Sequence, residues 1–184
     1  MADNDAAPYV DAAQRKIKIA GRHLVLLNEI RRADEIEELD VQLHFDGLLQ
    51  SGASASDKLA VAIGLIAGIR KAERIDLNHL LTKMGAGTID LGEIASCADA
   101  LSKWANERIV RDARGRRNLI VHRHYKKTPS TPELAWSLYP IKVEGKPSPY
   151  EGPLDVHAYS AKYVATLERL DAVATGLIPF CPSS

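Results

Sequence analysis

Apolar residues recur every three or four positions along most of this chain, and this spacing limits the folds open to it. The first segment, residues 8–50, has apolar positions at Ile17, Ala20, Leu24, Leu27 and Ile30, and then at Ile36, Leu39 and Leu43 after a bend expected near Ala33. A period of 3.6 residues gathers such positions into one stripe on a helix, and a stable helix buries that stripe against a neighbour. The spacing predicts an all-α protein.

Three further long segments carry the same spacing. The first begins after residues 51–54, where Ser51, Gly52 and Ser54 predict a helix break and Ser54 or Ser56 is expected to cap the new helix. The second begins at Asp90, with Glu93 as its capping partner. The third begins near Tyr159. The second is expected to continue to Gly115 and to kink or stop there, and the third to close at Gly176. Residues 76–83 predict a short helix or turn.

Residues 128–153 differ from the rest of the chain. Most of the nine prolines lie from Pro129 onward, and Leu134, Trp136 and Leu138 alternate with smaller residues. Alternation favours a short edge strand, with residues 141–143 pairing back on it. The whole pattern predicts a four-to-five-helix up-down bundle with a short β-like hairpin or loop before the last helix. We expect one domain over residues 1–184, with flexible tails at 1–8 and 178–184.

Composition favours an ordinary soluble protein. Apolar residues make up 46% and charged residues 26%, and no apolar run approaches the roughly 20 residues that span a bilayer. The acidic start lacks an export signal, which predicts a cytoplasmic protein without a membrane partner. Cys97 and Cys181 make neither a disulfide framework nor a zinc site, and we expect Cys97 to be a small buried hydrophobe. No cofactor and no metal are expected.

Positive charge is concentrated in residues 108–127. This segment holds eight Lys or Arg residues against one acid, Asp112, although the whole chain has 24 basic and 24 acidic side chains. Such segregated charge attracts phosphates and predicts RNA as partner. Residues 34–46 hold six acidic residues and no Lys or Arg. We expect a solvated face there, with a partner surface for the basic segment of another subunit as the alternative.

The segment also places a guanidinium, an amide and an imidazole close together. RNA cleavage without a metal needs a base for the ribose 2′-hydroxyl, an acid for the leaving oxygen and a cation for the transition state. His122 suits the first or second task, Arg117 the third, and Asn118 orients the imidazole or a phosphate. On a regular helix Arg117 lies about 140° from His122, so a shared site requires a long reach or a bend near Gly115.

Structural roles remain open for the same residues. His122 is equally compatible with a satisfied structural histidine, Arg117 with capping of helix carbonyls, and Tyr125 with packing. His122 and His124 form a His-x-His pair, but the neighbouring residues supply no further metal ligand. The other histidines, His23, His44, His79 and His157, are expected to be isolated surface or core residues.

The residues Arg117-Asn118-Leu119-Ile120-Val121-His122 resemble the Arg, polar residue, three residues, His motif of the HEPN-domain family. The resemblance covers the motif closely and the helical layout loosely. Toxins of that family often carry Tyr two residues after the His, whereas here Tyr125 follows His122 by three. A longer spacing from Arg117 to His124 is the alternative, so either histidine can be the critical one.

The resemblance implies a metal-independent endoribonuclease in a toxin–antitoxin, phage-defence or RNA-processing setting. It implies a homodimer with a composite site, in which Arg117 of one chain serves beside His122 of the other, and an antitoxin protein as a further partner. The expected RNA-contacting side chains are Arg111, Arg114, Arg116, Arg123, Lys126 and Lys127, with His124 and Tyr125 in support. The alternative is a HEPN-like module that binds RNA, nucleotide or a protein without cleavage.

Overall fold

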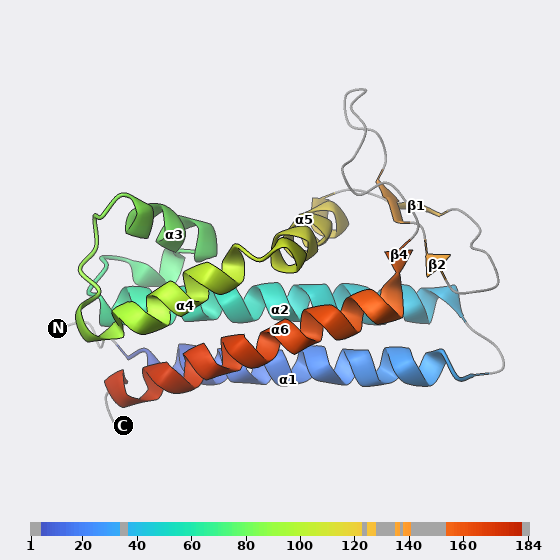
Figure 1. Cartoon of the computed structure of the whole chain (residues 1–184), viewed down its shortest axis with the longest axis horizontal. Helices are drawn as coiled ribbons and strands as arrows, with labels where there is room; N and C mark the ends of the chain where they lie inside the picture. The colour runs from blue at the N-terminus through green and yellow to red at the C-terminus, as the bar shows by residue number, and fades with distance from the viewer. Residues whose placement is uncertain are drawn as a thin grey trace.

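The computed structural model describes residues 5–33, 37–122, 125–127, 135–136, 138–140 and 154–181. Its helices are α1 (Ala7–Ile30), α2 (Glu38–Ile66), α3 (Leu77–Gly85), α4 (Ala95–Ala105), α5 (Arg108–His122) and α6 (Val156–Leu177), with the short 3-10 helices η1 (Ala72–Arg74), η2 (Gly92–Ile94) and η3 (Ile178–Phe180). The long helices α1, α2 and α6 lie side by side, and α3, α4 and α5 lie along one side of them (Figure 1). The predicted all-α class is confirmed.

Short strands lie between α5 and α6. β1 (Tyr125–Lys127) pairs antiparallel with β3 (Leu138–Pro140), and β2 (Ala135–Trp136) pairs antiparallel with β4 (Leu154–Asp155). A β-like excursion before the last helix was expected, and Pro140 stands at the end of its strand, where a missing N–H is tolerated. The strand expected at residues 141–143 lies outside the described residues.

The hydrophobic core fills the space between α1, α2 and α6 and extends under α4 and α5. Its largest side chains include Trp104, Tyr163 and Phe45, each at most 2% exposed. Phe45 of α2 meets Tyr159 of α6 edge to face, with ring centroids 5.9 Å apart. In the part of the chain that the structure describes, no helix combines the length and the hydropathy needed to cross a membrane.

The helix break expected at residues 51–54 is wrong. α2 continues without interruption from Glu38 to Ile66. A Cβ added at Gly52 would collide with the hydroxyl group of Tyr163 in α6, so the glycine gives α6 room to approach. Ser56 donates its hydroxyl to the carbonyl of Ala53 at 2.7 Å, inside the helix instead of capping one. Small residues therefore mark a close helix contact here.

The first segment is two helices instead of one bent helix. α1 ends at Ile30, the chain turns at Arg31–Ala33, and α2 begins at Glu38. The two helices pack against each other along their length (Figure 1). A reversal of direction is what allows the apolar stripe of one to be buried on the other.

The expected position of the break near Gly115 is also wrong. The helix ends at Asn106, which caps α4 by donating its side-chain amide to the carbonyl of Ser102 at 2.9 Å. α5 then runs through Gly115 to His122. Burial of Val110 and Ala113 on α5 outweighs the roughly 1 kcal/mol that glycine costs inside a helix.

The expected pairing of Asp90 with Glu93 is replaced by a tighter turn. The Asp90 carboxylate accepts a hydrogen bond from the amide of Gly92 at 3.0 Å, and η2 precedes α4. The predicted short helix is confirmed as α3, where Asp76 caps the first turn by accepting from the amide of His79 at 2.8 Å. The last helix is confirmed as α6, capped by Asp155.

His157 is buried in the first turn of α6. Its side chain is 3% exposed, and neither ring nitrogen has a hydrogen-bond partner among the described residues. Burial lowers the pKa of His157, nearby Arg31 lowers it further, and Asp155 opposes the shift. The folded protein therefore holds the neutral imidazole, whereas the unfolded chain takes up a proton as the pH falls.

Acidification should therefore cost stability through His157. The unfolded state binds more protons below about pH 6.5, so the contribution of this residue is full above that pH and declines as the pH falls. We expect the free energy of unfolding, measured by urea titration, to fall less between pH 7 and pH 5 in His157→Gln than in the wild type. His79→Gln, at an exposed site, is the control and should keep the wild-type slope. Identical slopes in all three proteins would contradict this assignment.

Candidate functional site

The basic helix α5 lies against α2 and α6 and is joined to α3 by a side-chain hydrogen bond. Some of its cationic side chains are exposed, and others bind neighbouring side chains. Arg108 and Arg111 are exposed. Arg114 donates to the side-chain oxygen of Asn78 in α3 at 2.6 Å. Arg116 pairs with Asp112 at 2.7 Å, and its guanidinium carbon lies 5.4 Å from the ring centroid of Tyr159. Arg114 and Arg116, both expected to contact RNA, thus also hold α5 to its neighbours.

The side chains of Arg117 and Asn118 are in contact. Nη1 of Arg117 donates to Oδ1 of Asn118 at 3.2 Å. Asn118 is exposed, whereas Arg117 is half-buried, and its Nε is buried without a hydrogen-bond partner among the described residues. This pair presents an amide at the surface beside a guanidinium that retains an unused donor.

Arg117 also affects a carboxylate on α2. Burial raises the pKa of Asp57, a hydrogen bond from the amide of Leu77 at 3.1 Å lowers it, and the cations of Arg114 and Arg117 lower it further, while Asp76 raises it. The positive charge of α5 is therefore partly balanced by Asp57. Sequence reasoning missed this carboxylate, because nothing local connects residue 57 with residue 117.

The remaining residues of the expected site lie at the end of α5 or beyond it. His122 is the last residue of α5, and the structure describes its backbone position only. Tyr125, Lys126 and Lys127 form β1, again as backbone. Arg123 and His124 lie outside the described residues.

The path of α5 decides how Arg117 and His122 relate. Five residues on a continuous helix separate them by about 140° around the axis and about 7.5 Å along it. The bend that was to bring them together is absent at Gly115, where α5 stays helical. Within one chain the two positions thus face different directions.

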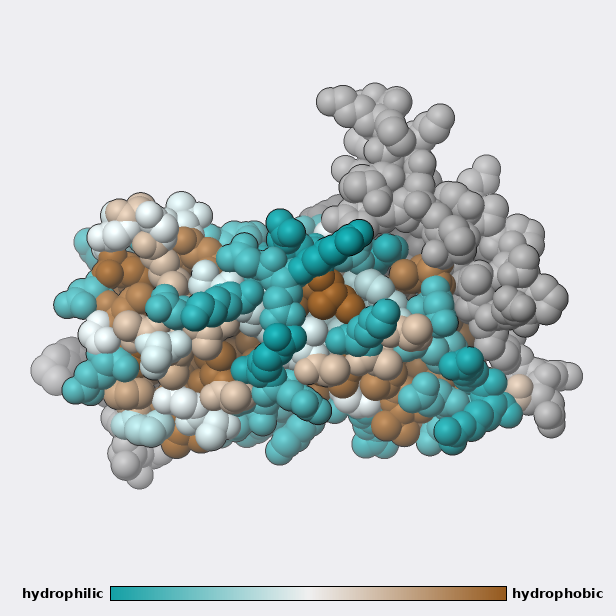
Figure 2. Space-filling view, in the orientation of Figure 1, coloured by the Kyte–Doolittle hydropathy of each residue, from teal (hydrophilic) through white to brown (hydrophobic). Residues whose placement is uncertain are grey.

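An open groove of about 700 Å³ runs between α5 and α6. Figure 2 shows this side of the molecule, where hydrophilic side chains surround an apolar patch. The charged residues that line the groove are Glu107, Arg108, Asp112, Arg116, Lys162 and Arg169. Cations outnumber acids in this set, so the groove favours anionic ligands.

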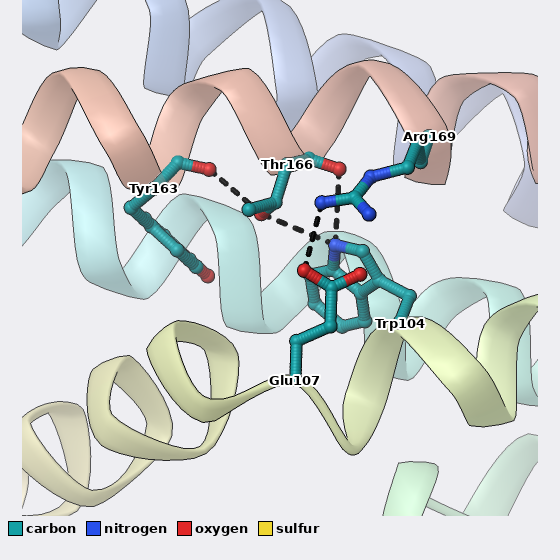
Figure 3. A network of polar contacts seen from close by, with 5 residues as sticks. All are labelled: Trp104, Glu107, Tyr163, Thr166 and Arg169. Atoms are coloured by element: carbon teal, nitrogen blue, oxygen red, sulfur yellow. Dashed lines mark hydrogen bonds and ion pairs between the residues drawn. The ribbon is translucent and has the colours of Figure 1, made fainter.

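Two of these cations come from α6 and were not predicted. Lys162 and Arg169 are both exposed and stand seven residues apart on one face of the helix. Arg169 bonds Glu107 at 2.7 Å across the groove, next to the buried Trp104 (Figure 3). The sequence shows that Lys162 and Arg169 are seven residues apart. Only the packing of α6 against α5 places these two side chains beside the basic helix.

Asp46 departs from the solvated face expected for residues 34–46. Glu37 and Asp40 are exposed, but Asp46 is half-buried, and its Oδ1 has no hydrogen-bond partner among the described residues. Burial raises the pKa of Asp46 to about 6. Eleven residues separate Asp46 from Asp57, which places them about 20° apart on α2 and therefore on the same face.

Two histidines expected to be isolated form a pair. Nδ1 of His23 in α1 lies 3.2 Å from Nδ1 of His44 in α2, and the ring centroids are 5.4 Å apart. Burial lowers the pKa of His23, and His44 lowers it further. Cys97 and Cys181 are free thiols, each half-buried. Within the described ranges, no group of three or more His, Cys, Asp or Glu side chains is placed to hold a metal ion.

Comparison with known proteins adds no relative. No protein-family model, no curated protein and no solved structure matches this chain at a significant level.

Proposed function

We propose that this protein is a metal-independent endoribonuclease of the HEPN type. The observation that carries the proposal is the contact between Arg117 and Asn118 on a basic helix that ends five residues later at His122. The order Arg, Asn, three residues, His resembles the HEPN motif, and the helical fold agrees with that resemblance. A defence, toxin–antitoxin or RNA-processing setting, with an antitoxin protein as partner, belongs to the same proposal.

The chemistry assigns one task to each group. The 2′-oxygen of the ribose attacks the adjacent phosphorus, the bond from phosphorus to the 5′-oxygen breaks, and a 2′,3′-cyclic phosphate and a 5′-hydroxyl result. His122 removes the 2′-hydroxyl proton or protonates the leaving oxygen. Arg117 stabilises the negative charge on the phosphoryl oxygens in the transition state, and Asn118 orients the imidazole or a phosphate. His124 is the alternative to His122.

The active unit in this proposal is a homodimer. The positions of Arg117 and His122 lie about 140° apart around one α5, so two copies facing each other supply the pair in this proposal. Arg117 of one protomer then acts beside His122 of the other. Phosphate contacts come from the exposed Arg111 and from the Arg123, Lys126 and Lys127 side chains, with Tyr125 in support. Such contacts make RNA binding strongly dependent on salt.

A second candidate is a HEPN-like module that binds RNA, nucleotide or a protein without cleaving RNA. The position of Arg117 favours it, because this guanidinium is half-buried and its charge opposes the rise in the pKa of Asp57 that burial causes. A half-buried arginine whose charge is partly balanced by a carboxylate can serve the structure alone.

RNA cleavage in excess EDTA separates the two candidates. Purified full-length protein is incubated with total RNA beside Arg117→Ala, His122→Ala and the control His79→Ala. We expect cleavage by the wild type and the control, and a loss of at least about 100-fold in the two site variants, as for removal of a general base or a transition-state donor. The products should end in a cyclic phosphate.

Three results would contradict the proposal. Intact RNA that is nevertheless bound, with a salt-dependent affinity, supports the binding module. Cleavage that EDTA abolishes indicates a metal-dependent enzyme. Equal cleavage by the wild type and both site variants places the activity elsewhere in the protein or in a contaminant.

A further inference from the structure

The His23–His44 pair stands apart from the basic helix and has no role in the proposed RNA chemistry. His23 lies on α1 and His44 on α2, and both side chains are half-buried. Their Nδ1 atoms are 3.2 Å apart and share one hydrogen bond, in which one ring donates and the other accepts according to tautomer. Each nitrogen that faces the other is therefore a potential metal ligand in its neutral, deprotonated form.

The separation of these nitrogens suits a single small cation. Zinc is bound by histidine at about 2.0–2.1 Å, and two nitrogens 3.2 Å apart at that distance subtend roughly 100° at the metal, near the tetrahedral angle. The two rings are tilted by 45° to each other. Rotation of the His44 imidazole directs its lone pair at an ion bound to Nδ1 of His23.

The packing of α1 on α2 holds one of the rings in place. A Cβ added at Gly47 of α2 would lie 2.5 Å from Cε1 and from Nε2 of His23. The missing side chain at Gly47 thus makes the space that this imidazole occupies. Nε2 of His23 faces Gly47 of α2, and Nδ1 of His23 faces His44 of the same helix. A ring fixed in this way loses little further freedom when it binds an ion.

We propose that His23 and His44 form a two-histidine binding site for a divalent transition metal, of which Zn²⁺ and Cu²⁺ suit imidazole best. The proton between the two Nδ1 atoms moves through solvent to Nε2 of the ring that donated it, so both neutral rings carry hydrogen on Nε2 and the ion binds between the two Nδ1 atoms. Water completes the coordination, because no cluster of three or more His, Cys, Asp or Glu ligands exists in the described ranges. The site is independent of the proposed ribonuclease activity.

Zinc titration of the untagged, EDTA-dialysed protein tests this site by calorimetry. We expect one equivalent of Zn²⁺ per chain, released by EDTA. His23→Gln and His44→Gln each remove one nitrogen ligand and should weaken binding by at least about tenfold. His79→Gln changes an exposed histidine on α3 and should bind Zn²⁺ as the wild type does. Glutamine keeps the side chain polar and of similar size, and circular dichroism verifies the fold of each variant.

A second variant tests the geometry without removing a ligand. Gly47→Ala places a methyl group against the imidazole of His23 and should weaken Zn²⁺ binding while both histidines remain. Co²⁺ gives an independent signal, since visible absorption of a tetrahedral complex should develop in the wild type and be lost in both histidine variants. No Zn²⁺ binding by the wild type, or equal binding by the wild type and the two glutamine variants, would overturn the proposal.

Discussion

An equimolar mixture of the Arg117→Ala and His122→Ala proteins, unfolded and refolded together, should cleave RNA at about one quarter of the wild-type rate, although each variant alone is nearly inactive. Random pairing makes half of the dimers mixed. In a mixed dimer, one composite site has Arg117 from one protomer and His122 from the other, whereas the second site lacks both. The continuous course of α5, which separates the two positions by about 140°, is the reason to expect this exchange.

Refolding each variant separately before mixing is the control, since slow exchange of subunits then leaves the mixture inactive at first. A chain with both substitutions should rescue neither single variant, because it restores no composite site when it pairs with either of them. Light scattering verifies that the jointly refolded protein is a dimer. If this dimer does not regain RNA cleavage, Arg117 and His122 act within one chain or not at all.

Replacement of Trp104 by alanine should lower the free energy of unfolding by about 3–5 kcal/mol. Trp104 is 2% exposed, and its indole N–H donates to both the carbonyl oxygen and Oγ1 of Thr166, at 3.1 and 3.2 Å (Figure 3). The hydroxyl of Thr166 donates in turn to the carbonyl of Tyr163 at 2.7 Å. The substitution thus removes a large buried ring and the donor that joins α4 to α6.

Urea unfolding followed by far-ultraviolet circular dichroism measures this effect. Trp104→Phe keeps most of the ring and loses the N–H, so a smaller cost of about 1–2 kcal/mol is expected from the unpaired acceptors. Lys103→Ala, at the exposed neighbouring position, should change the stability by less than about 0.5 kcal/mol. A cost below about 1 kcal/mol for Trp104→Ala would mean that α4 contributes little to the folded core.

The apolar spacing predicted the helices better than it predicted their ends. α6 was expected from the stripe that includes Tyr163 and Leu167, and both are buried. The break expected at Gly52 and the kink expected at Gly115 are wrong for one reason, which is that glycine lowers helix propensity by only about 1 kcal/mol. Packing across helices exceeds this cost, and the contact of Gly52 with Tyr163 is such a case.

The candidate site was predictable where neighbours in the sequence are neighbours in space. Arg117 and Asn118 are adjacent in the motif, and their side chains are in contact. Lys162 and Arg169 across the groove were not predicted, since they follow the motif by forty residues or more. His23 and His44 were expected to be isolated, because neither has a ligand partner at helical spacing on its own helix.

The sequence by itself determined the all-α class, the buried stripes and the presence of Arg117, Asn118 and His122 on one basic helix. These follow from the 3.6-residue period, which depends only on local backbone geometry. Only the tertiary structure decided where the helices end, that α5 passes Gly115 without a break, and that His23 meets His44. Those features depend on contacts between residues far apart in the chain, which no local period records.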